Sequence, residues 1–520
     1  MALVPVKNVG QYGVNRDLSV HELPINVWTD AQNIRFLDGY ARPSYGTTNI
    51  YSGTPNPVYH VMPVTVAGVR TWLLGLANSI YSVVEPGTYT DLTRASGGAY
   101  TATINSWTST MLGGIPILNN GTDAPQQWLL TGKCTDLSNW PASTTCASIR
   151  AFKNLLVAVD VTKSGTRYPY MVKWSHPADP GSVPSSWDIT DATKDAGEFD
   201  LSDGYDYIVD CLGLRDSLIV YKQQSVWRLD YIGGVFVLRS QKVLGTSGAM
   251  NKNCIVEIDG QHAVLTNMDV VIHDGQQATS ILDKQSRRYL FDNIDETYRG
   301  RCFVFKNPFF NEIYFCYPSM GHTACNKAMV WNWVERTVTF RDLDTAIGIT
   351  HAAHGPVDVT TLTAWSNDSD AWSSDTTAWN QPAVVPDVSR VLLAINNSKL
   401  LLLDSGYTQN SVGYDSYIER AGLSFDAPNK MKMVTRIYPR ISGAAGTVIW
   451  VYVASMDTPY DTPNYQTGIA FYTIGTTVSC DFFITGRYFA IKFYGGSTIG
   501  TGLNWRLDSF DVEVKIVGDW

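Results

Sequence analysis

The sequence predicts an all-β protein, a β-propeller of six to seven blade-like meanders with an appended antiparallel β-sandwich. Three observations lead to this prediction. Aromatic residues make up 12% of the chain and accompany 42 glycines and 23 prolines, a composition that favours strands joined by tight turns. Helical periodicity is nearly absent along the 520 residues. A unit of strand, tight turn and strand recurs instead, with hairpin turns such as Asp259-Gly260 and Asp274-Gly275.

The recurring units are interpreted as propeller blades. Several turn-to-turn intervals approach the roughly 40–50 residues of one blade. Because no helices are predicted to cover the sheets, the sheets must bury their faces against one another, and radial stacking does so with short, protected edges. We therefore predict a propeller over residues 51–410, with one large sandwich as the alternative. The units cover residues 59–84, 149–174, 207–229, 254–275, 301–333 and 391–403.

The remaining segments are assigned by their position in the chain and their pattern of apolar and charged residues. Residues 1–50 are predicted to form an N-terminal arm and capping strand. Residues 411–520 are predicted to form the C-terminal sandwich, because strands such as 510–516 alternate apolar and charged side chains.

Residues 343–390 interrupt the propeller pattern as a Trp-rich insertion. Trp365, Trp372 and Trp379 recur there every seven residues, separated by Ser, Asp, Asn and Thr. In one interpretation these side chains pin an extended insertion to the body of the protein. In the other they form an aromatic platform that contacts a partner or a glycan.

Composition narrows the function classes. The chain has 39 Lys and Arg against 48 Asp and Glu, a formal charge of −9, which excludes a basic nucleic-acid clamp. We expect no secretory signal and no membrane insertion, since no apolar run approaches the roughly 20 residues of a membrane span. The eight cysteines contain no Cys-x-x-Cys pair, so we expect reduced, buried thiols and folding in a cytoplasm.

No sequence motif of a catalytic, cofactor or metal site is found. The P-loop, Gly-x-Ser-x-Gly and His-Glu-x-x-His patterns are absent from the sequence. His351 and His354 lack a third ligand nearby and are interpreted as a chance pair. Carboxylates are plentiful, and a glycan hydrolase needs only two of them, so that alternative stays open. We predict a protein that is not an enzyme and binds no cofactor.

Cationic side chains gather in two places. Lys284, Arg287 and Arg288 are predicted to lie in a loop. A second set is interpreted as the solvated face of one or two strands, or as a rim that docks an acidic neighbour. It consists of Lys430, Lys432, Arg436 and Arg440.

Five short motifs carry a resemblance to a known family. Residues 18–39 read LSVHELPINVWTDAQNIRFLDG and are followed by RPSYG at 42–46. The others are NNGTDAPQQW at 119–128, VKWSHPADP at 172–180, SVWRLDYIGG at 225–234 and GRYFAIKF at 486–493. In this order they resemble tail nozzle proteins, also called tail hub or tail tubular B-like proteins, of short-tailed bacteriophages.

Two of these motifs supply the candidate assembly or structural residues. The N-terminal motif is interpreted either as a capping strand with Trp28 in the core, or as an arm that wedges against a neighbouring subunit or adaptor. Arg35 and Asp38 would supply polar contacts in both cases. The full set is Glu22, Pro24, Trp28, Asn33, Arg35, Asp38, Gly39, Asn120, Gly121 and Asp123.

The resemblance implies a structural virion protein. It would form a homohexameric tail nozzle below the portal and its adaptor ring, with tail fibres or spikes attached, assembled in the host cytoplasm. Double-stranded DNA would leave through the central channel without sequence-specific binding. Six copies at −9 would carry −54, which favours a channel that repels phosphate. The alternative functions are a receptor- or glycan-binding tail protein that uses Trp365, Trp372 and Trp379, and, behind it, a glycan hydrolase.

Overall fold

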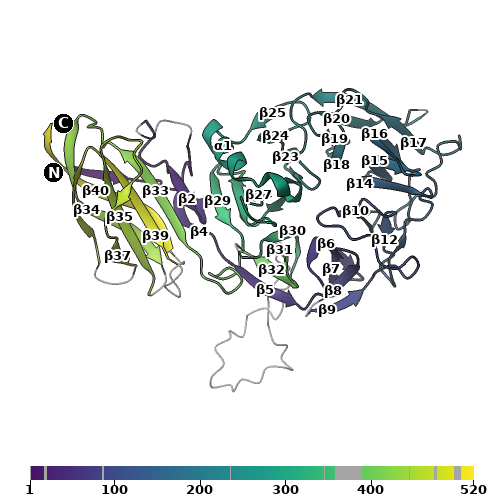
Figure 1. Cartoon of the computed structure of the whole chain (residues 1–520), viewed down its shortest axis with the longest axis horizontal. Helices are drawn as coiled ribbons and strands as arrows, with labels where there is room; N and C mark the ends of the chain where they lie inside the picture. Colours follow the sequence, from purple (N-terminus) through teal and green to yellow (C-terminus); the bar gives the residue numbers. More distant parts are fainter. Residues whose placement is uncertain are drawn as a thin grey trace, which may run out of the picture.

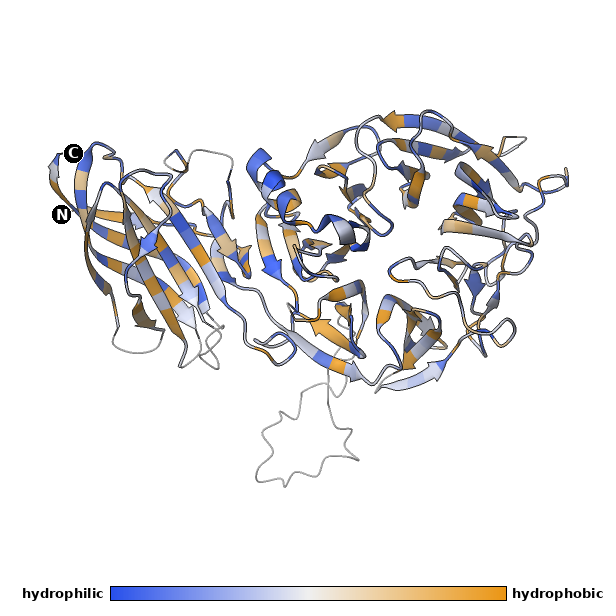
Figure 2. Ribbon diagram, in the orientation of Figure 1, coloured by the Kyte–Doolittle hydropathy of each residue, from blue (hydrophilic) through white to orange (hydrophobic). Residues whose placement is uncertain are grey.

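The computed structural model describes the chain apart from residues 1, 17–19, 21, 85–86, 235, 345, 358–388, 444–445, 474–476, 497–504 and 520. Figure 1 shows a ring-shaped domain beside a layered one, with both chain termini on the layered domain. Strands dominate both domains, which confirms the predicted all-β class. Along these strands, hydrophobic and hydrophilic residues alternate (Figure 2).

The ring is a β-propeller, and the described residues form seven four-stranded antiparallel blades. Blade 1 comprises β6 (Val58–Val66), β7 (Val69–Leu76), β8 (Ile80–Val84) and β9 (Thr88–Asp91). Blade 2 comprises β10 (Thr108–Leu112), β11 (Ile115–Asn119), β12 (Gln126–Gln127) and β13 (Thr135–Asp136). Blade 3 comprises β14 (Thr144–Phe152), β15 (Leu155–Lys163), β16 (Thr166–Trp174) and β17 (Gly197–Asp200).

The next three blades continue the order of the chain around the ring. Blade 4 comprises β18 (Ile208–Leu214), β19 (Ser217–Lys222), β20 (Val226–Tyr231) and β21 (Leu238–Leu244). Blade 5 comprises β22 (Ile255–Ile258), β23 (Gln261–Leu265), β24 (Val270–His273) and β25 (Ala278–Ser280). Blade 6 comprises β26 (Phe303–Asn307), β27 (Glu312–Tyr317), β28 (Lys327–Asn332) and β29 (Val338–Asp342).

Blade 7 closes the ring with strands from both ends of the propeller sequence. Its order is β30 (Ile349–Pro356), β31 (Ser389–Ile395), β32 (Lys399–Leu403) and β5 (Thr47–Ser52). β5 pairs antiparallel with β32, so the N-terminal segment supplies the outermost strand. The first strands β10, β14, β18, β22, β26, β30 and β6 contact one another in that order.

Two predicted boundaries differ from this strand pairing. The boundary at residue 50 falls within β5, and the predicted insertion at 343–390 contains β30, the first strand of blade 7. β30 was missed because its centre, Thr350-His-Ala-Ala-His354, is small and polar and lacks apolar alternation. Blade 2 was missed as a meander because β12 and β13 have only two residues each. Trp365, Trp372 and Trp379 lie outside the described residues.

The layered domain is the predicted sandwich, and the N-terminal segment belongs to it. One sheet contains β3 (Ile34–Leu37), β4 (Tyr40–Pro43), β40 (Trp505–Asp519), β34 (Lys430–Gly443) and β38 (Cys480–Gly486), and β1 (Ala2–Val6) also pairs with β40. The other contains β2 (Asp30–Gln32), β33 (Ser416–Leu423), β39 (Tyr488–Gly495), β35 (Val448–Met456), β36 (Asn464–Tyr465) and β37 (Ile469–Tyr472). Strands β1 to β4 are therefore part of the sandwich rather than a separate arm.

The second sheet runs without a break into the propeller. β2 pairs antiparallel with β33 of the sandwich and parallel with β29, the last strand of blade 6. Blade 6 and this sheet therefore form one ten-stranded sheet. Backbone hydrogen bonds thus connect the two domains, in addition to the chain connections.

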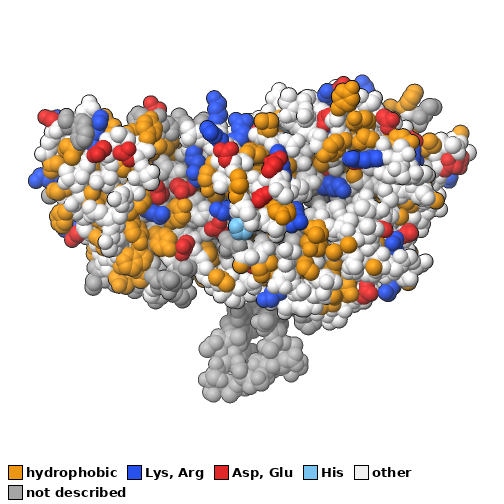
Figure 3. All heavy atoms as spheres, viewed as in Figure 1, with side chains coloured by type: hydrophobic (Ala, Val, Ile, Leu, Met, Phe, Trp, Pro, Cys, Tyr) orange, Lys and Arg blue, Asp and Glu red, His pale blue; other side chains and the backbone are white. Residues whose placement is uncertain are grey.

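The first basic cluster takes a different form from the one predicted, whereas the second lies on a strand as predicted, with one buried member. The first lies on a helix: α1 (Lys284–Asn293) is capped by Asp283 and is followed by the 3-10 helix η1 (Glu296–Arg301) between blades 5 and 6. The loop prediction for Lys284, Arg287 and Arg288 was wrong, and Figure 3 shows Lys and Arg side chains gathered over α1. In the second cluster, on β34, Lys432 is buried and donates to the Ala427 carbonyl at 2.6 Å, whereas Arg436 and Arg440 are exposed.

Candidate functional site

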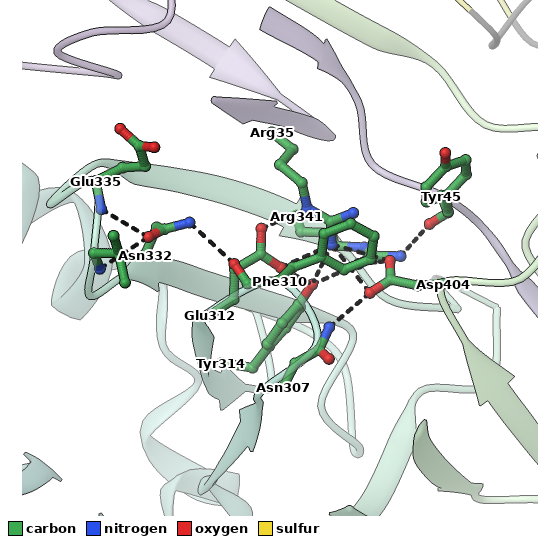
Figure 4. Close-up of polar contacts among 11 residues, drawn as sticks. Arg35, Tyr45, Asn307, Phe310, Glu312, Tyr314, Asn332, Glu335, Arg341 and Asp404 are labelled. Carbon is green, nitrogen blue, oxygen red and sulfur yellow. Dashed lines mark hydrogen bonds and ion pairs between the residues drawn. The ribbon is translucent and has the colours of Figure 1, made fainter. Parts of the chain in front are cut away.

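Arg35 of the N-terminal motif lies in a buried ionic cluster between the sandwich and the propeller (Figure 4). It lies on β3, and its guanidinium donates to Glu312 of β27 at 2.5 and 2.7 Å. It also pairs with Asp404, which directly follows β32, at 3.0 Å. The Arg35 side chain is 1% exposed, and its Cζ lies 3.7 Å from the ring centre of Phe310. One side chain thus connects the sandwich to blades 6 and 7.

A second arginine completes this cluster. Arg341 of β29 pairs with Asp404 at 3.1 Å and donates to the Tyr314 hydroxyl at 2.6 Å and to the Tyr45 carbonyl. The two guanidinium groups balance the carboxylates of Glu312 and Asp404, so the buried charge sums to zero. Burial alone would raise the pKa of Asp404, but Arg35 and Arg341 outweigh it and hold that pKa below its ordinary value. We call Arg35, Glu312, Tyr314, Arg341 and Asp404 the interdomain joint.

Two more predicted residues belong to the sandwich and its connection to the propeller. Asn33 donates to the Asp415 carbonyl at 2.7 Å and accepts from the Asp342 backbone N–H at 2.7 Å, which links blade 6 to the start of the sandwich. Trp28 is 1% exposed, packs in the sandwich core against Phe493 and Phe510, and donates to the Val9 carbonyl at 2.6 Å. The structure therefore brings Trp28, Asn33 and Arg35 together as packing residues of the sandwich and its connection.

The other predicted N-terminal residues lie apart from the joint. Asp38 and Gly39 form the turn between β3 and β4, and both have positive φ angles, 47° and 79°. Glu22 and Pro24 lie on the surface between β1 and β2. Sequence reasoning missed Glu312 and Asp404, the partners of Arg35, because they lie 277 and 369 residues away along the chain. It also missed Arg341, the second arginine of the joint.

Asn120, Gly121 and Asp123 form a fixed turn of blade 2 in the propeller. The Asn120 Oδ1 atom accepts from the Asp123 backbone N–H at 2.8 Å, and its Nδ2 donates to the Asp123 carboxylate at 2.7 Å. Asp123 also accepts from the Thr101 backbone N–H at 2.8 Å, which ties the turn to the segment after blade 1. Gly121, with φ of 83°, lines a cavity of about 390 Å³ at this face of the propeller.

Polar side chains near the first strands of the blades form a network across the middle of the propeller. Arg150 of β14 pairs with Asp210 of β18 at 2.7 Å and donates to the Ser109 carbonyl of β10 at 2.7 Å. Asn253, two residues before β22, accepts from Arg150 at 3.1 Å and donates to the Trp107 carbonyl, just before β10, at 3.0 Å. Because blades 2 and 5 stand on opposite sides of a seven-membered ring, the last of these bonds crosses the axis.

Blades 1, 6 and 7 complete this axial network with aromatic rings. The rings of His60 of β6 and His351 of β30 lie 4.2 Å apart, and the ring of Phe303 of β26 stacks on His351 at 5.6 Å. His60 also hydrogen-bonds the Ser109 hydroxyl at 2.8 Å. The axial network, defined as His60, Ser109, Arg150, Asp210, Asn253, Phe303 and His351, thus draws one residue from each blade and fills the bore at this level.

Burial lowers the pKa of several buried propeller histidines and so favours their neutral form. It lowers the pKa of His351 to about 3, with Arg150 acting in the same direction, and it lowers the pKa of His262 and of His273 to about 4. His351 and His354 are three apart on a strand and therefore point to opposite faces, which is incompatible with a shared metal ion. Within the described parts of the chain, no group of three His, Cys, Asp or Glu side chains is arranged to hold a metal ion.

The cysteine side chains are buried, as the sequence predicts, and all eight are free. Burial raises the pKa of several of these thiols, including that of Cys146 to about 12. No helix in the described residues is both long and apolar enough to cross a membrane.

Comparison with known proteins gives likenesses of fold only. No family model matches the chain, and no curated protein matches it. Among solved structures, virginiamycin B lyase from Staphylococcus aureus is similar at 10% identity and a TM-score of 0.38, over 69% of this chain and 97% of that one. The extracellular domain of a one-component system from B. thetaiotaomicron is similar at 10% identity and a TM-score of 0.41, over 94% of this chain and 63% of that one.

Proposed function

We propose that this protein is a structural subunit of the tail of a short-tailed bacteriophage, six copies of which form the tail nozzle. The observation that carries the proposal is the place of the N-terminal motif that resembles nozzle proteins. Its residues Trp28, Asn33 and Arg35 pack or bond at the sandwich and its connection to blades 6 and 7. A motif that fixes the relative placement of two domains is expected in a protein with a structural role.

The interior of the propeller supports a channel between subunits rather than through one subunit. The Asn253–Trp107 hydrogen bond and the adjacent rings of His60 and His351 leave no passage for a duplex at that level of the bore. In the proposed ring, DNA passes along the sixfold axis, outside every propeller.

Rigidity within the subunit also supports the proposal. The ten-stranded sheet and the interdomain joint connect propeller and sandwich by backbone hydrogen bonds and by buried ion pairs. A ring that carries DNA under pressure needs subunits whose domains keep one relative placement. Adaptor and fibre or spike contacts would then use the outer surfaces of such a fixed unit.

Charge is consistent with a conduit that does not hold DNA. Each copy carries −9, so six copies carry −54, and phosphate is repelled at medium range. Binding to DNA would instead need Lys and Arg aligned on phosphates, with a steep dependence on salt. We infer a virion location in the tail, with the adaptor ring, the fibres or spikes and the passing DNA as partners and no catalytic role.

Electron microscopy of intact virions, with subunits counted in the tail, tests the proposal. We expect six copies in a ring whose central bore lies on the portal axis. Three copies in a peripheral appendage would contradict the nozzle and favour a receptor-binding protein. Cleavage of host polysaccharide by the purified protein would contradict the non-enzymatic role, and a bore lined by Lys and Arg would contradict the repulsive channel.

A further inference from the structure

The cavity beside Gly121 has the composition of a binding site for a small polar ligand. It opens between blades 3 and 4, on the face where the turn of Asn120 and Gly121 lies, and its volume of about 390 Å³ falls within the roughly 300–1,000 Å³ of small-molecule pockets. Its wall includes Asp160, Thr162, Arg167, Tyr207 and Lys252. Neither the nozzle function nor the interdomain joint uses any of these side chains.

Lys252 differs from the three lysines that are buried in the described residues. Lys173 pairs with Glu198 at 3.0 Å, and Lys222 donates to the Leu201 carbonyl at 2.9 Å. Lys432 donates to the Ala427 carbonyl. Lys252 is partly buried, yet its Nζ makes no hydrogen bond or ion pair with any residue that the structure describes. The ammonium group borders the cavity without a protein acceptor, so a ligand that supplies an acceptor is favoured there.

The backbone leaves room at this ammonium group. Gly121 has φ of 83°, and a Cβ atom at this position would lie 3.1 Å from the Lys252 Nζ. A side chain at residue 121 would therefore crowd the ammonium group and narrow the cavity. Burial lowers the pKa of Lys252, while the carboxylate of Asp210 and then Cys146 and Asp160 act in the opposite direction.

The rest of the cavity wall adds a second cation, an acceptor and a ring. Arg167 binds the Asp160 carboxylate through two hydrogen bonds of 2.8 and 2.6 Å, and its side chain is 56% exposed. The Tyr207 ring lies 5.2 Å from the guanidinium carbon of Arg167 and is partly exposed. With Lys252 the wall carries two positive charges and one negative charge, a net charge that suits one ligand carboxylate. Asp160 and the Thr162 hydroxyl are suited to ligand hydroxyl groups.

We propose that this cavity binds a small hydroxylated carboxylate, such as a sugar acid, with Lys252 bonded to the carboxylate group. Asp160 and Thr162 contact the hydroxyl groups, and the Tyr207 ring borders the sugar ring. This site is independent of the nozzle proposal, because it needs neither a ring of subunits nor DNA.

Calorimetric titration of the full-length protein with D-glucuronate tests the proposal, with D-glucose and inorganic phosphate as comparison ligands. We expect glucuronate to bind and glucose to bind at least about tenfold more weakly, since a charge-assisted hydrogen bond is worth about tenfold to a hundredfold in affinity. Phosphate should also bind at least about tenfold more weakly, because it lacks the ring and the hydroxyl groups that Tyr207, Asp160 and Thr162 would contact. Equal binding of glucose would contradict the role of the charge. Equal binding of phosphate would contradict the sugar-acid class, and no binding of glucuronate would overturn the site.

Two variants distinguish binding at Lys252 from nonspecific attraction of the ligand to surface lysines. Lys252→Met should weaken glucuronate binding by about tenfold or more. Its thermal stability without ligand should be equal to or above that of the parent protein, because an unpartnered ammonium group is removed. Lys515→Met removes an exposed lysine of the sandwich and should leave binding unchanged. Equal affinity of the Lys252→Met variant and the parent protein would refute the assignment of Lys252.

Discussion

The interdomain joint and the axial network are both buried and both contain an Arg–Asp ion pair, but they hold different kinds of structure together. The joint consists of four formal charges drawn from the sandwich and from blades 6 and 7. The axial network has one ion pair, Arg150–Asp210, surrounded by neutral hydrogen-bonding groups and rings near the first strands of the blades. The joint fixes the placement of two domains, whereas the network fills the centre of one.

This difference predicts that the joint and the axial network respond differently to the loss of an arginine. In the joint, each carboxylate depends on arginines for its neutralisation, so loss of one arginine leaves a buried charge unbalanced. In the axial network, Asp210 keeps hydrogen bonds from the Ser148 hydroxyl and from the backbone N–H groups of Cys211 and Asn253 when Arg150 is lost. The joint should therefore be the more fragile of the two.

Loss of Arg35 should have the largest effect. Arg35→Met leaves Glu312 buried without its ion-pair partner and halves the neutralisation of Asp404, so we expect the free energy of unfolding to fall by about 3–5 kcal/mol. Chemical denaturation measures this change, and limited proteolysis should reveal earlier cleavage between the sandwich and the propeller. Arg506→Met, which breaks the exposed Arg506–Asp508 pair in the same domain, is the matched control and should cost less than about 1 kcal/mol. Equal effects of the two substitutions would contradict the structural role of the joint.

Loss of Arg150 should have a smaller effect. Arg150→Met removes the ion pair to Asp210 and the bond to the Ser109 carbonyl, and we expect a loss of about 2–3 kcal/mol because Asp210 retains its other donors. Denaturation of this variant beside Arg35→Met gives the comparison directly. The ranking of the two regions is wrong if Arg150→Met proves the more damaging substitution.

Acidification should weaken the axial network and leave the joint intact. The pKa of His351 is lowered from 6.5 to about 3, so the unfolded chain binds a proton between these values and the folded chain does not. Stability from this histidine is therefore present above about pH 6.5 and is lost as pH falls toward 3, by about 2 kcal/mol at pH 5. The pKa of Asp404 is lowered, so this carboxylate stays ionised at pH 5 and keeps its ion pairs with Arg35 and Arg341.

Hydrogen exchange and one variant check this pH dependence. Between pH 7 and pH 5, protection corrected for the intrinsic exchange rate should fall in β6 and β30 and persist in β3. His351→Gln should reduce the loss of unfolding free energy over this range by about 2 kcal/mol relative to the parent protein. An unchanged loss in this variant would mean that other groups carry the pH dependence.

The same two regions explain how far the sequence could predict the structure. Strand alternation and turns such as Asp259-Gly260 are local signals, and they predicted the propeller class and the sandwich; both turn residues have positive φ, 45° and 73°. Arg35 was selected as a polar contact residue, but its partners are distant in the chain, and no local pattern pairs residue 35 with residue 404.

The sequence did not predict β30 or the closure of blade 7 by β5, and the physical reason is the same. β30 lies at the axis, where Thr350 bonds the Val58 and Ala394 carbonyls and His351 packs against other rings, so its sequence lacks the alternation of a half-buried strand. β5 closes blade 7 by pairing with β32, some 350 residues later, and that closure depends on the whole propeller being in place. Periodicity reports the solvent-facing and core-facing sides of a strand, and it cannot report which distant strand is its neighbour.

Replacement of one turn glycine near each region should cause the smallest loss of unfolding free energy. The two replacements test whether backbone strain in a turn affects the joint or the axial network. Gly39 ends the turn that leads from β3, the strand of Arg35, and has φ of 79°; Gly68 ends the turn between β6 and β7 and has φ of 83°. A Cβ atom at either position has open space or a contact no closer than 4.0 Å, so Ala costs only backbone strain, about 1 kcal/mol in each case. Equal losses in denaturation would show that the joint tolerates a strained turn in its own hairpin. A clearly larger loss for Gly39→Ala than for Gly68→Ala would mean that the strain reaches Arg35, because the two turns differ mainly in what their strands carry.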